Sequence, residues 1–327
     1  MKWYNVAGRA EKLRPVSIII GGRGIGKTYS AIDFVVNSGR PFIYMRNTDT
    51  QMQESSSVFG NPFKRWARDH GRDIRLVAEK KHYMIYEYHG DSDRDLIGYG
   101  VALSTFESLR GVDLSDVELV VFDEFIENRT LAFDQFSAFA NFYETVNRNR
   151  ELTGEKPLMC ILLSNAQRLT NAILAGYGCI DIIERMIKSG QHLFTNEYLM
   201  IELPESEVSE AKKKTANYRL TEGSRFYDEA LKNSFANDSF AGIKKRPLSE
   251  YIPIVGIDDI YIYRHKSSGR LYASRVYSNT VAEFTSRDSL PAFLRQFGAL
   301  LRESAIAQLI DYQDFATKVK LTEILRI

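Results

Sequence analysis

The sequence predicts an α/β fold with a mostly parallel sheet, followed by a second, smaller domain. Apolar runs at 16–20, 42–46 and 118–122 have the length of strands that are buried on both faces. A glycine-rich turn and a segment with helical periodicity join the first two runs, which is the order of a βαβ unit. The 327 residues are enough for about two domains of ordinary size.

The N-terminal elements follow one another in a regular order. Residues 16–20 (VSIII) are predicted as a buried strand, and residues 27–37 as a helix that Gly39 ends. Residues 42–46 (FIYMR) are predicted as the next strand. Residues 74–88 alternate as a hairpin does, and a further strand is expected within 95–104.

The middle of the chain contains two more buried strands with a helix between them. Residues 118–122 (ELVVF) and 158–163 (LMCILL) are the strands. Residues 133–150 are predicted as a helix with aromatic side chains on one face. The spacing suits a strand at 158–163 that lies between the strand at 16–20 and the strand at 118–122.

The composition changes after Pro204. Residues 205–220 consist mainly of charged and small side chains, so we place a linker or small helical subdomain at 204–240, between domains at 1–203 and 241–327. The remaining predicted elements are a helix at 224–236, a loop at 241–249, strands at 252–263 and 270–277 with a hairpin turn at 267–269, and helices at 289–301 and 303–318.

Composition excludes several classes of protein. The 43 basic and 42 acidic residues nearly cancel, so contacts with nucleic acid must come from local patches. Cys160 and Cys179 form neither a disulfide framework nor a metal knuckle, and the five histidines lack ligand spacing. No apolar run reaches the length of a membrane span, so we expect that the protein has no membrane partner. We also expect that it lies in a reducing cytoplasm.

Residues 21–28 (GGRGIGKT) match the phosphate-binding pattern GxxxxGK[ST] at every position. Glycines let successive backbone N–H groups turn inward around phosphates, and the helix that follows presents its positive end to them. Lys27 is expected to reach the β- and γ-phosphates, and the Thr28 hydroxyl to bind Mg²⁺. The predicted ligands of ATP are Gly21, Gly22, Arg23, Gly24, Ile25, Gly26, Lys27 and Thr28.

An acidic pair, Asp123 and Glu124, follows the strand predicted at 118–122. Ligands bind at the carboxyl ends of the strands in open α/β sheets. We expect Asp123 to hold Mg²⁺ through water and Glu124 to orient or deprotonate the attacking water. The presence of both acids favours hydrolysis over small-molecule kinase activity, because a kinase must exclude water.

Ser164 and Asn165 end the strand predicted at 158–163. They are candidates for contacting the γ-phosphate or the attacking water. The alternative is that the pair begins a turn.

The arginines and lysines leave more alternatives open. Arg148 and Arg150 lie near the end of the helix predicted at 133–150, where an arginine either serves a neighbouring active site or interacts with the helix dipole. Arg23, Arg46 and Arg110 are further candidates near the nucleotide. Basic clusters either contact nucleic-acid phosphates or form solvated faces; they comprise Lys212, Lys213, Lys214, Arg219, Arg225, Lys244, Lys245 and Arg246.

These motifs resemble those of one family, the genome-packaging ATPases (encapsidation proteins) of phi-29-like bacteriophages. The resemblance covers the chain up to about residue 200. The segments that carry it are GGRGIGKTYS at 21–30, FIYMR at 42–46, VVFDEFI at 120–126, ETVNRNRE at 144–151 and ILLSNA at 161–166.

The resemblance implies an ASCE-type, RecA-like P-loop domain that works as a homopentameric ring. Such a ring sits at the portal (connector) vertex of a prohead and uses ATP to drive double-stranded DNA inward. The implied location is the host cytoplasm and, transiently, the portal vertex, but not the mature virion. Arg148 matches the arginine that the family donates to a neighbouring subunit, and Arg110 lies in a loop where the family has a basic residue. Some relatives also use a packaging RNA.

The resemblance also implies a C-terminal domain similar to RNase H-like nucleases that lacks the metal-binding acids. Asp258 and Asp259 lie in the strand predicted at 252–263, where such a fold places its first metal ligand. The other acids of this region show no cluster spacing. We therefore expect a vestigial nuclease domain that binds nucleic acid. The alternatives are a terminase-like motor with an active nuclease and a P-loop scaffold that turns over slowly and ignores DNA.

Overall fold

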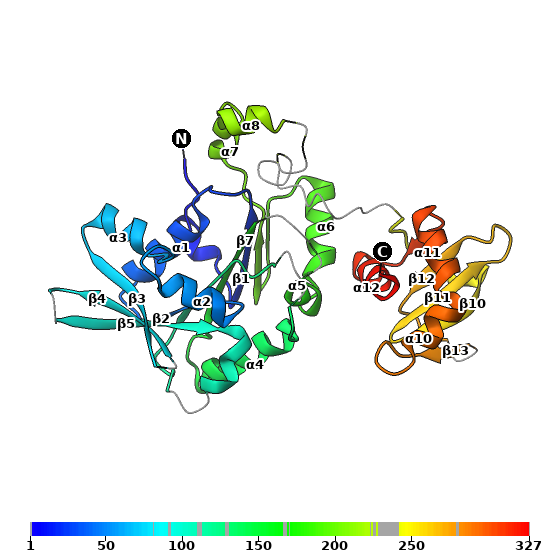
Figure 1. Ribbon diagram of the computed structural model, residues 1–327, viewed down its shortest axis with the longest axis horizontal. Coiled ribbons are helices and arrows are strands. Elements are labelled where there is room, and N and C mark those ends of the chain that lie inside the picture. Colours follow the sequence, from blue (N-terminus) through cyan, green and yellow to red (C-terminus); the bar gives the residue numbers. More distant parts are fainter. Residues whose placement is uncertain are drawn as a thin grey trace. The chain divides into compact units, whose positions relative to one another are not determined.

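The computed structural model describes residues 2–80, 82–90, 93–109, 113–127, 131–165, 169, 171–222, 224, 227, 242–278 and 281–326. The chain forms two compact units (Figure 1). The first consists of Met1–Tyr177 and Ile182–Asn237, and the second of Gly178–Asp181 and Asp238–Ile327. Each unit is described by itself.

A large sheet forms the centre of the first unit, with strand order β3-β4-β5-β2-β6-β7-β1-β9-β8 among the described residues. The strands from β5 to β9 in this order pair in parallel, and antiparallel hairpins extend the sheet at its two ends. The predicted, mostly parallel α/β sheet is therefore confirmed. The strands are β1 (Val16–Gly21), β2 (Phe42–Arg46), β3 (Asp73–Glu79), β4 (His82–Tyr88), β5 (Arg94–Ala102), β6 (Leu119–Asp123), β7 (Met159–Asn165), β8 (Leu193–Thr195) and β9 (Leu199–Glu202).

Strand β7 pairs with β1 on one side and with β6 on the other. The expectation that the strand at 158–163 lies between the other two is therefore confirmed. This order brings the carboxyl ends of the three strands to one edge, where their polar residues meet.

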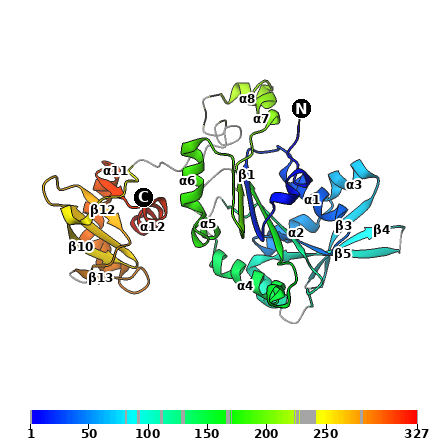
Figure 2. The same ribbon diagram turned by 180° about the vertical axis from the view of Figure 1, so that it is seen from behind.

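Helices cover both faces of this sheet (Figures 1 and 2). Successive strand residues point to opposite faces, so Ile19 and Tyr44 pack with Ile32 of α1 and Trp66 of α3. On the opposite face the ring of Phe122 stacks on Phe139 of α4, and their centroids are 5.8 Å apart. The helices are η1 (Ala7–Lys12), α1 (Lys27–Asn37), α2 (Asp49–Ser56), α3 (Lys64–His70), η2 (Leu103–Leu109), α4 (Gln135–Asn147), η3 (Arg150–Thr153), α5 (Ala172–Gly176), α6 (Cys179–Ser189), α7 (Glu207–Lys212) and α8 (Ala216–Leu220).

The predicted helix at 133–150 ends earlier than expected, at Asn147. Arg148 and Asn149 both take left-handed backbone angles, with φ of 46° and 60°, which stop the helix. The short hairpin β8–β9 was not predicted.

The second unit is an α+β domain with a five-stranded sheet of order β13-β10-β11-β12-β14 among its described residues. Its helices pack on one face through an apolar cluster that includes Val255, Phe293 and Leu321. The elements are η4 (Leu248–Glu250), β10 (Tyr251–Ile257), β11 (Ile260–His265), β12 (Leu271–Ser274), β13 (Ala282–Phe284), α10 (Leu290–Phe293), the π-turn η5 (Leu294–Gly298), α11 (Ala299–Ile306), β14 (Ile310–Tyr312) and α12 (Phe315–Leu325).

Two predictions for this unit were wrong. The strand predicted at 252–263 is a hairpin, β10 and β11, and Asp258 and Asp259 form its turn; Asp258 has a φ of 51°. The helix predicted at 303–318 is interrupted by β14, which pairs in parallel with β12. Gln308, with a φ of 56°, ends the preceding helical turn.

The helix predicted at 224–236 lies almost wholly outside the described residues. Within 204–240 the structure describes α7 and α8. The boundaries predicted at 203 and 240, and the RNase H-like character of the last domain, stay predictions. No helix in the described part of the chain has both the length and the apolar character needed to cross a membrane.

Candidate nucleotide site

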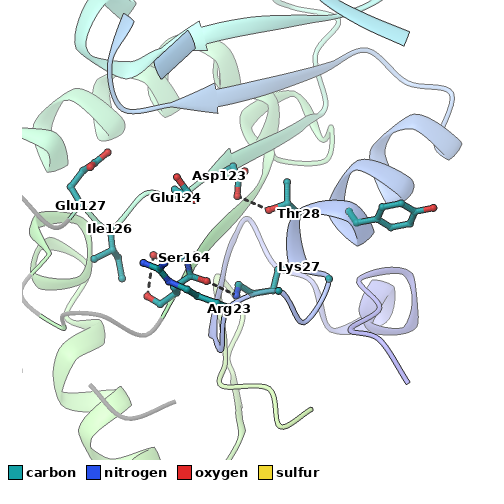
Figure 3. Close-up of a pocket in the computed structure, with 12 residues that line it drawn as sticks. Arg23, Lys27, Thr28, Asp123, Glu124, Ile126, Glu127 and Ser164 are labelled. Carbon is teal, nitrogen blue, oxygen red and sulfur yellow. Dashed lines mark hydrogen bonds between the residues drawn. The ribbon is translucent and has the colours of Figure 1, made fainter. Parts of the chain in front are cut away.

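The loop between β1 and α1 has the backbone of a phosphate cradle (Figure 3). Gly24 and Gly26 have φ of 61° and 100°, angles at which a side chain would be strained. The Lys27 ammonium is buried, with 7% of the residue exposed, and donates to the carbonyl oxygens of Gly21 at 2.9 Å and Gly22 at 2.8 Å. The loop therefore folds around the lysine.

Lys27 also donates to the side-chain oxygen of Asn165, at 3.1 Å. Burial lowers the pKa of the Lys27 ammonium to about 8, although the charge of Asp123 opposes this shift. A phosphate beside this ammonium would favour its charged form. The site is thus suited to an anion.

Asp123 and Thr28 meet at the start of α1. The Thr28 hydroxyl donates to Asp123 Oδ1 at 2.9 Å, and the buried Tyr44 hydroxyl donates to Oδ2 at 3.0 Å. Burial raises the pKa of the Asp123 carboxyl. A hydroxyl and a carboxylate oxygen side by side are ligands that Mg²⁺ accepts, so the residues present fit this ion.

Glu124 follows Asp123 in a left-handed conformation with a φ of 52°. Its side chain is 54% exposed and its Oε2 accepts from the Arg46 guanidinium at 2.6 Å. Arg46 also lies 3.6 Å from Asp123 Oδ2. The sequence left the role of Arg46 open; the structure places it against both carboxylates, because β2 pairs with β6 and Met45 lies opposite Phe122.

A network of buried amides supports this strained turn. Asn47 Nδ2 donates to the backbone oxygens of Glu124 at 3.1 Å and Phe125 at 3.3 Å. Gln135 donates to Asn47 Oδ1 at 2.6 Å, and Asn171 donates to Gln135 Oε1 at 2.7 Å. These bonds hold the backbone that positions Glu124.

A cleft of about 640 Å³ lies over these groups (Figure 3). It brings together residues predicted from three separate motifs. Glu127, which also lines it, was not predicted; its Oε1 accepts from Asn47 and Gln51. The lining comprises Arg23, Gly24, Gly26, Lys27, Thr28, Tyr29, Asp123, Glu124, Ile126, Glu127, Ser164 and Asn165.

Ser164 and Asn165 end β7 beside the loop. Asn165 contacts Lys27, as described above, whereas the buried Ser164 hydroxyl donates to the backbone oxygen of Asn165 at 3.2 Å. Because Asn165 contacts Lys27 and lines the cleft, it would lie near a phosphate that Lys27 holds. A role for either residue in sensing the phosphate stays a prediction.

The candidate arginines separate into different environments. Arg148 is the C-cap of α4, and its guanidinium is about half-exposed and donates to Asp113 at 3.0 Å. Arg150 is buried and donates to the backbone oxygens of Ser115 and Val117, both at 2.7 Å, so it is structural. The cleft lining given above contains neither of them, and Arg110 lies outside the described residues.

Some side chains of the basic clusters form ion pairs with acidic residues. Lys213 contacts Glu210 at 2.5 Å, and Arg246 binds Asp311 at 2.6 Å. Lys212 instead reaches the phosphate-binding loop, where it donates to the backbone oxygen of Arg23.

Among the described residues of the second unit, the acids do not form a metal cluster. The Lys320 ammonium lies 2.6 Å from Asp259 and 3.8 Å from Asp258. In the described part of the chain, no group of three or more His, Cys, Asp or Glu side chains could hold a metal ion.

Comparison with known proteins identifies relatives over most of the chain. The family model described as podovirus DNA encapsidation protein (Gp16) matches residues 2–286. The DNA packaging proteins of Bacillus phages PZA and phi29 are each 29% identical over 252 residues, which cover 75% of this chain and 69% of each relative.

Two solved structures share the fold. The bacteriophage phi-29 viral genome packaging motor assembly matches with a TM-score of 0.66 at 22% identity. The phi-28 gp11 DNA packaging motor matches with a TM-score of 0.63 at 19% identity. Each comparison covers 99% of this chain and 98% of the other.

Proposed function

The chain belongs to the podovirus DNA encapsidation protein family, and we propose that it is an ATP-hydrolysing motor that moves double-stranded DNA into a preformed prohead. The observation that carries the proposal is the cleft in which the phosphate-binding loop meets Asp123 and Glu124. A site with an anion cradle, metal-binding oxygens and a base has the groups that phosphoryl transfer to water requires.

The loop supplies the binding groups. Its backbone and Lys27 hold the phosphates of ATP, and Asn165 orients the lysine. Thr28 and Asp123 would hold Mg²⁺, which neutralises phosphate charge when it is bound. Tyr44 fixes the Asp123 carboxylate through its second oxygen.

Glu124 is the group that activates water in this proposal. Its half-exposed carboxylate lies at the cleft, and Arg46 holds one of its oxygens. The Oε2 atom is occupied by the Arg46 guanidinium, so in this proposal the water is bound by Oε1 or by a carboxylate that has turned from Arg46.

The assembly we propose is a homopentameric ring at the portal vertex, with Arg148 reaching the γ-phosphate in a neighbouring subunit. The exposure of Arg148 outside its own cleft supports a role in trans. Portal, double-stranded DNA and a packaging RNA are the proposed partners.

The second unit is proposed to contact nucleic acid without cutting it. A hydrolytic metal site needs free carboxylates, and Asp258 and Asp259 instead share the Lys320 ammonium. This pairing favours a vestigial nuclease over the active nuclease of a terminase-like motor.

Steady-state hydrolysis of MgATP by the full chain tests the chemistry. The Glu124→Gln variant should bind ATP as the wild type does but lose about 10²- to 10⁴-fold in turnover, because it removes a general base. Glu118→Gln is the matched control; this residue lies just before β6 and pairs with Arg40 at 2.8 Å. Tight ATP binding with equally slow turnover in wild type and Glu124→Gln would support the scaffold alternative instead.

A further inference from the structure

The segment at 204–212, which follows β9 of the large sheet, packs against the phosphate-binding loop at two points. A Cβ added to Gly21 would lie 2.9 Å from Pro204 Cγ, which shows how closely the loop and this segment approach. Eight residues later, at the end of α7, the Lys212 side chain crosses back to the loop. It donates to the backbone oxygen of Arg23 at 2.5 Å.

The Lys212 ammonium lies beside Gly24, a loop residue that lines the cleft, although Lys212 itself is not among the lining residues. A Cβ added to Gly24, which lines the cleft, would lie 2.7 Å from Lys212 Nζ. The Lys27 ammonium is bound to the carbonyls of Gly21 and Gly22, directly before Arg23 in the chain. Two lysine ammonium groups, one from α1 and one from α7, therefore gather at the same end of the loop.

The chemistry of these contacts leaves Lys212 able to bind a further anion. A lysine ammonium has three donors. The described residues give it one acceptor, the Arg23 carbonyl, and one aromatic face, the Tyr218 ring at 5.9 Å from its centroid. Burial lowers the pKa of Lys212. A phosphate beside this ammonium would favour its charged form.

We propose that Lys212 is a second phosphate-binding residue, which contacts the γ-phosphate end of ATP and thereby couples α7 to the nucleotide. The proposal rests on the proposed function, because it requires ATP in this cleft. Loops of this kind hold the β- and γ-phosphates of ATP, and a cation that binds the γ-phosphate would favour ATP over ADP. Since α7 lies in the segment that leads toward the second unit, loss of the γ-phosphate would remove one contact between that segment and the nucleotide and leave only the contacts with the loop.

Binding measurements in a non-hydrolysing background test this directly. Chains that carry Glu124→Gln are compared with and without Lys212→Ala, by calorimetric titration with MgATP and with MgADP. A charge-assisted hydrogen bond to phosphate predicts an increase in Kd for MgATP of about 10- to 100-fold. The Kd for MgADP should change by less than about threefold. Lys213→Ala is the matched control, because Lys213 is the next residue and pairs with Glu210.

Two further measurements separate phosphate binding from a structural role. Lys212→Arg retains the charge and should keep the preference for ATP over ADP. If Lys212 acted only through the shape of its side chain, the arginine would not restore this preference. In the chain with Lys212 intact, hydrogen exchange at the amides of 207–215 should slow when MgATP is added. In the Lys212→Ala variant, MgATP should not slow this exchange.

The possible outcomes are distinct. No change in MgATP binding by Lys212→Ala, or an equal loss for MgATP and MgADP, would overturn the inference and leave the proposed function intact. If the chain with Lys212 intact bound neither nucleotide, the proposed function and the inference would both fail.

Discussion

At the scale of single residues, the site depends on side chains that fix the two carboxylates. Lys27, Thr28, Asp123 and Glu124 could be predicted, because a complete loop pattern and an acidic pair after a strand carry them. Tyr44 donates to Asp123 and Arg46 donates to Glu124, but the roles of these two residues could not be assigned from the sequence. Their roles depend on β2 lying next to β6, and strand order is decided by packing of the whole sheet rather than by local sequence.

The bond between Tyr44 and Asp123 leads to a prediction at this scale. Tyr44→Phe removes the donor to a buried carboxylate oxygen, so the free energy of unfolding should fall by about 1–3 kcal/mol. ATP binding should also need a higher Mg²⁺ concentration, because the carboxylate is no longer held in position. Urea denaturation and Mg²⁺ titration of ATP binding measure the two effects.

A matched hydroxyl deletion distinguishes this role from general packing. Tyr83→Phe removes a hydroxyl that donates to Asp49 at 2.8 Å, in a partly buried pair outside the cleft lining. Its Mg²⁺ dependence should equal that of the wild type. Equal Mg²⁺ dependence of both variants and the wild type would contradict the positioning role of Tyr44.

At the scale of elements, prediction succeeded where one local signal dominated. The helix at 27–37 agrees with α1 because the loop glycines define its start, and the apolar strands agree with β1, β2, β6 and β7. The helix predicted at 303–318 was wrong, because the short β14 is stabilised by its pairing with β12 and local sequence alone favoured helix. Asp258 and Asp259 illustrate the same limit: a two-residue turn inside an apolar run is easily read as one strand.

Close approach of backbones in the large sheet gives a prediction for one element. A Cβ added to Gly98 of β5 would lie 2.5 Å from the backbone oxygen of Phe42 in the paired strand β2. Gly98→Ala should therefore lower the free energy of unfolding by about 1–3 kcal/mol, since the two strands must separate. Chemical denaturation measures the loss.

Gly90→Ala serves as the control for this change. Apart from its chain neighbours, no described residue lies within 4 Å of a Cβ at Gly90, and its φ is not in the left-handed range. We expect a change within about 0.5 kcal/mol. Equal stability of the two variants would show that β2 and β5 do not approach as described.

At the scale of the whole molecule, the nucleotide site belongs to a chain that we propose to be a DNA-packaging motor. The near-neutral net charge of +1 does not oppose this, because a translocating grip needs only few and transient phosphate contacts. The first unit was predictable from its motifs, whereas the second unit has no catalytic motif from which its role could be inferred.

The proposed ring leads to a prediction about mixed subunits. Arg148→Ala and Glu124→Gln should each abolish ATP hydrolysis alone, because one lacks the trans arginine and the other the base. A mixture should regain activity wherever an intact Glu124 of one subunit meets an intact Arg148 of its neighbour. Hydrolysis rates across mixing ratios measure this, and an inactive mixture at every ratio would place the arginine in its own subunit's site.

Steady-state ATP hydrolysis with Mg²⁺, measured with and without linear double-stranded DNA, tests the proposed motor. We expect that DNA stimulates hydrolysis by the wild type, that Glu124→Gln abolishes the stimulated rate, and that the DNA remains uncut on a gel. A wild-type rate that DNA leaves unchanged, or a stimulated rate that survives in Glu124→Gln, would contradict it.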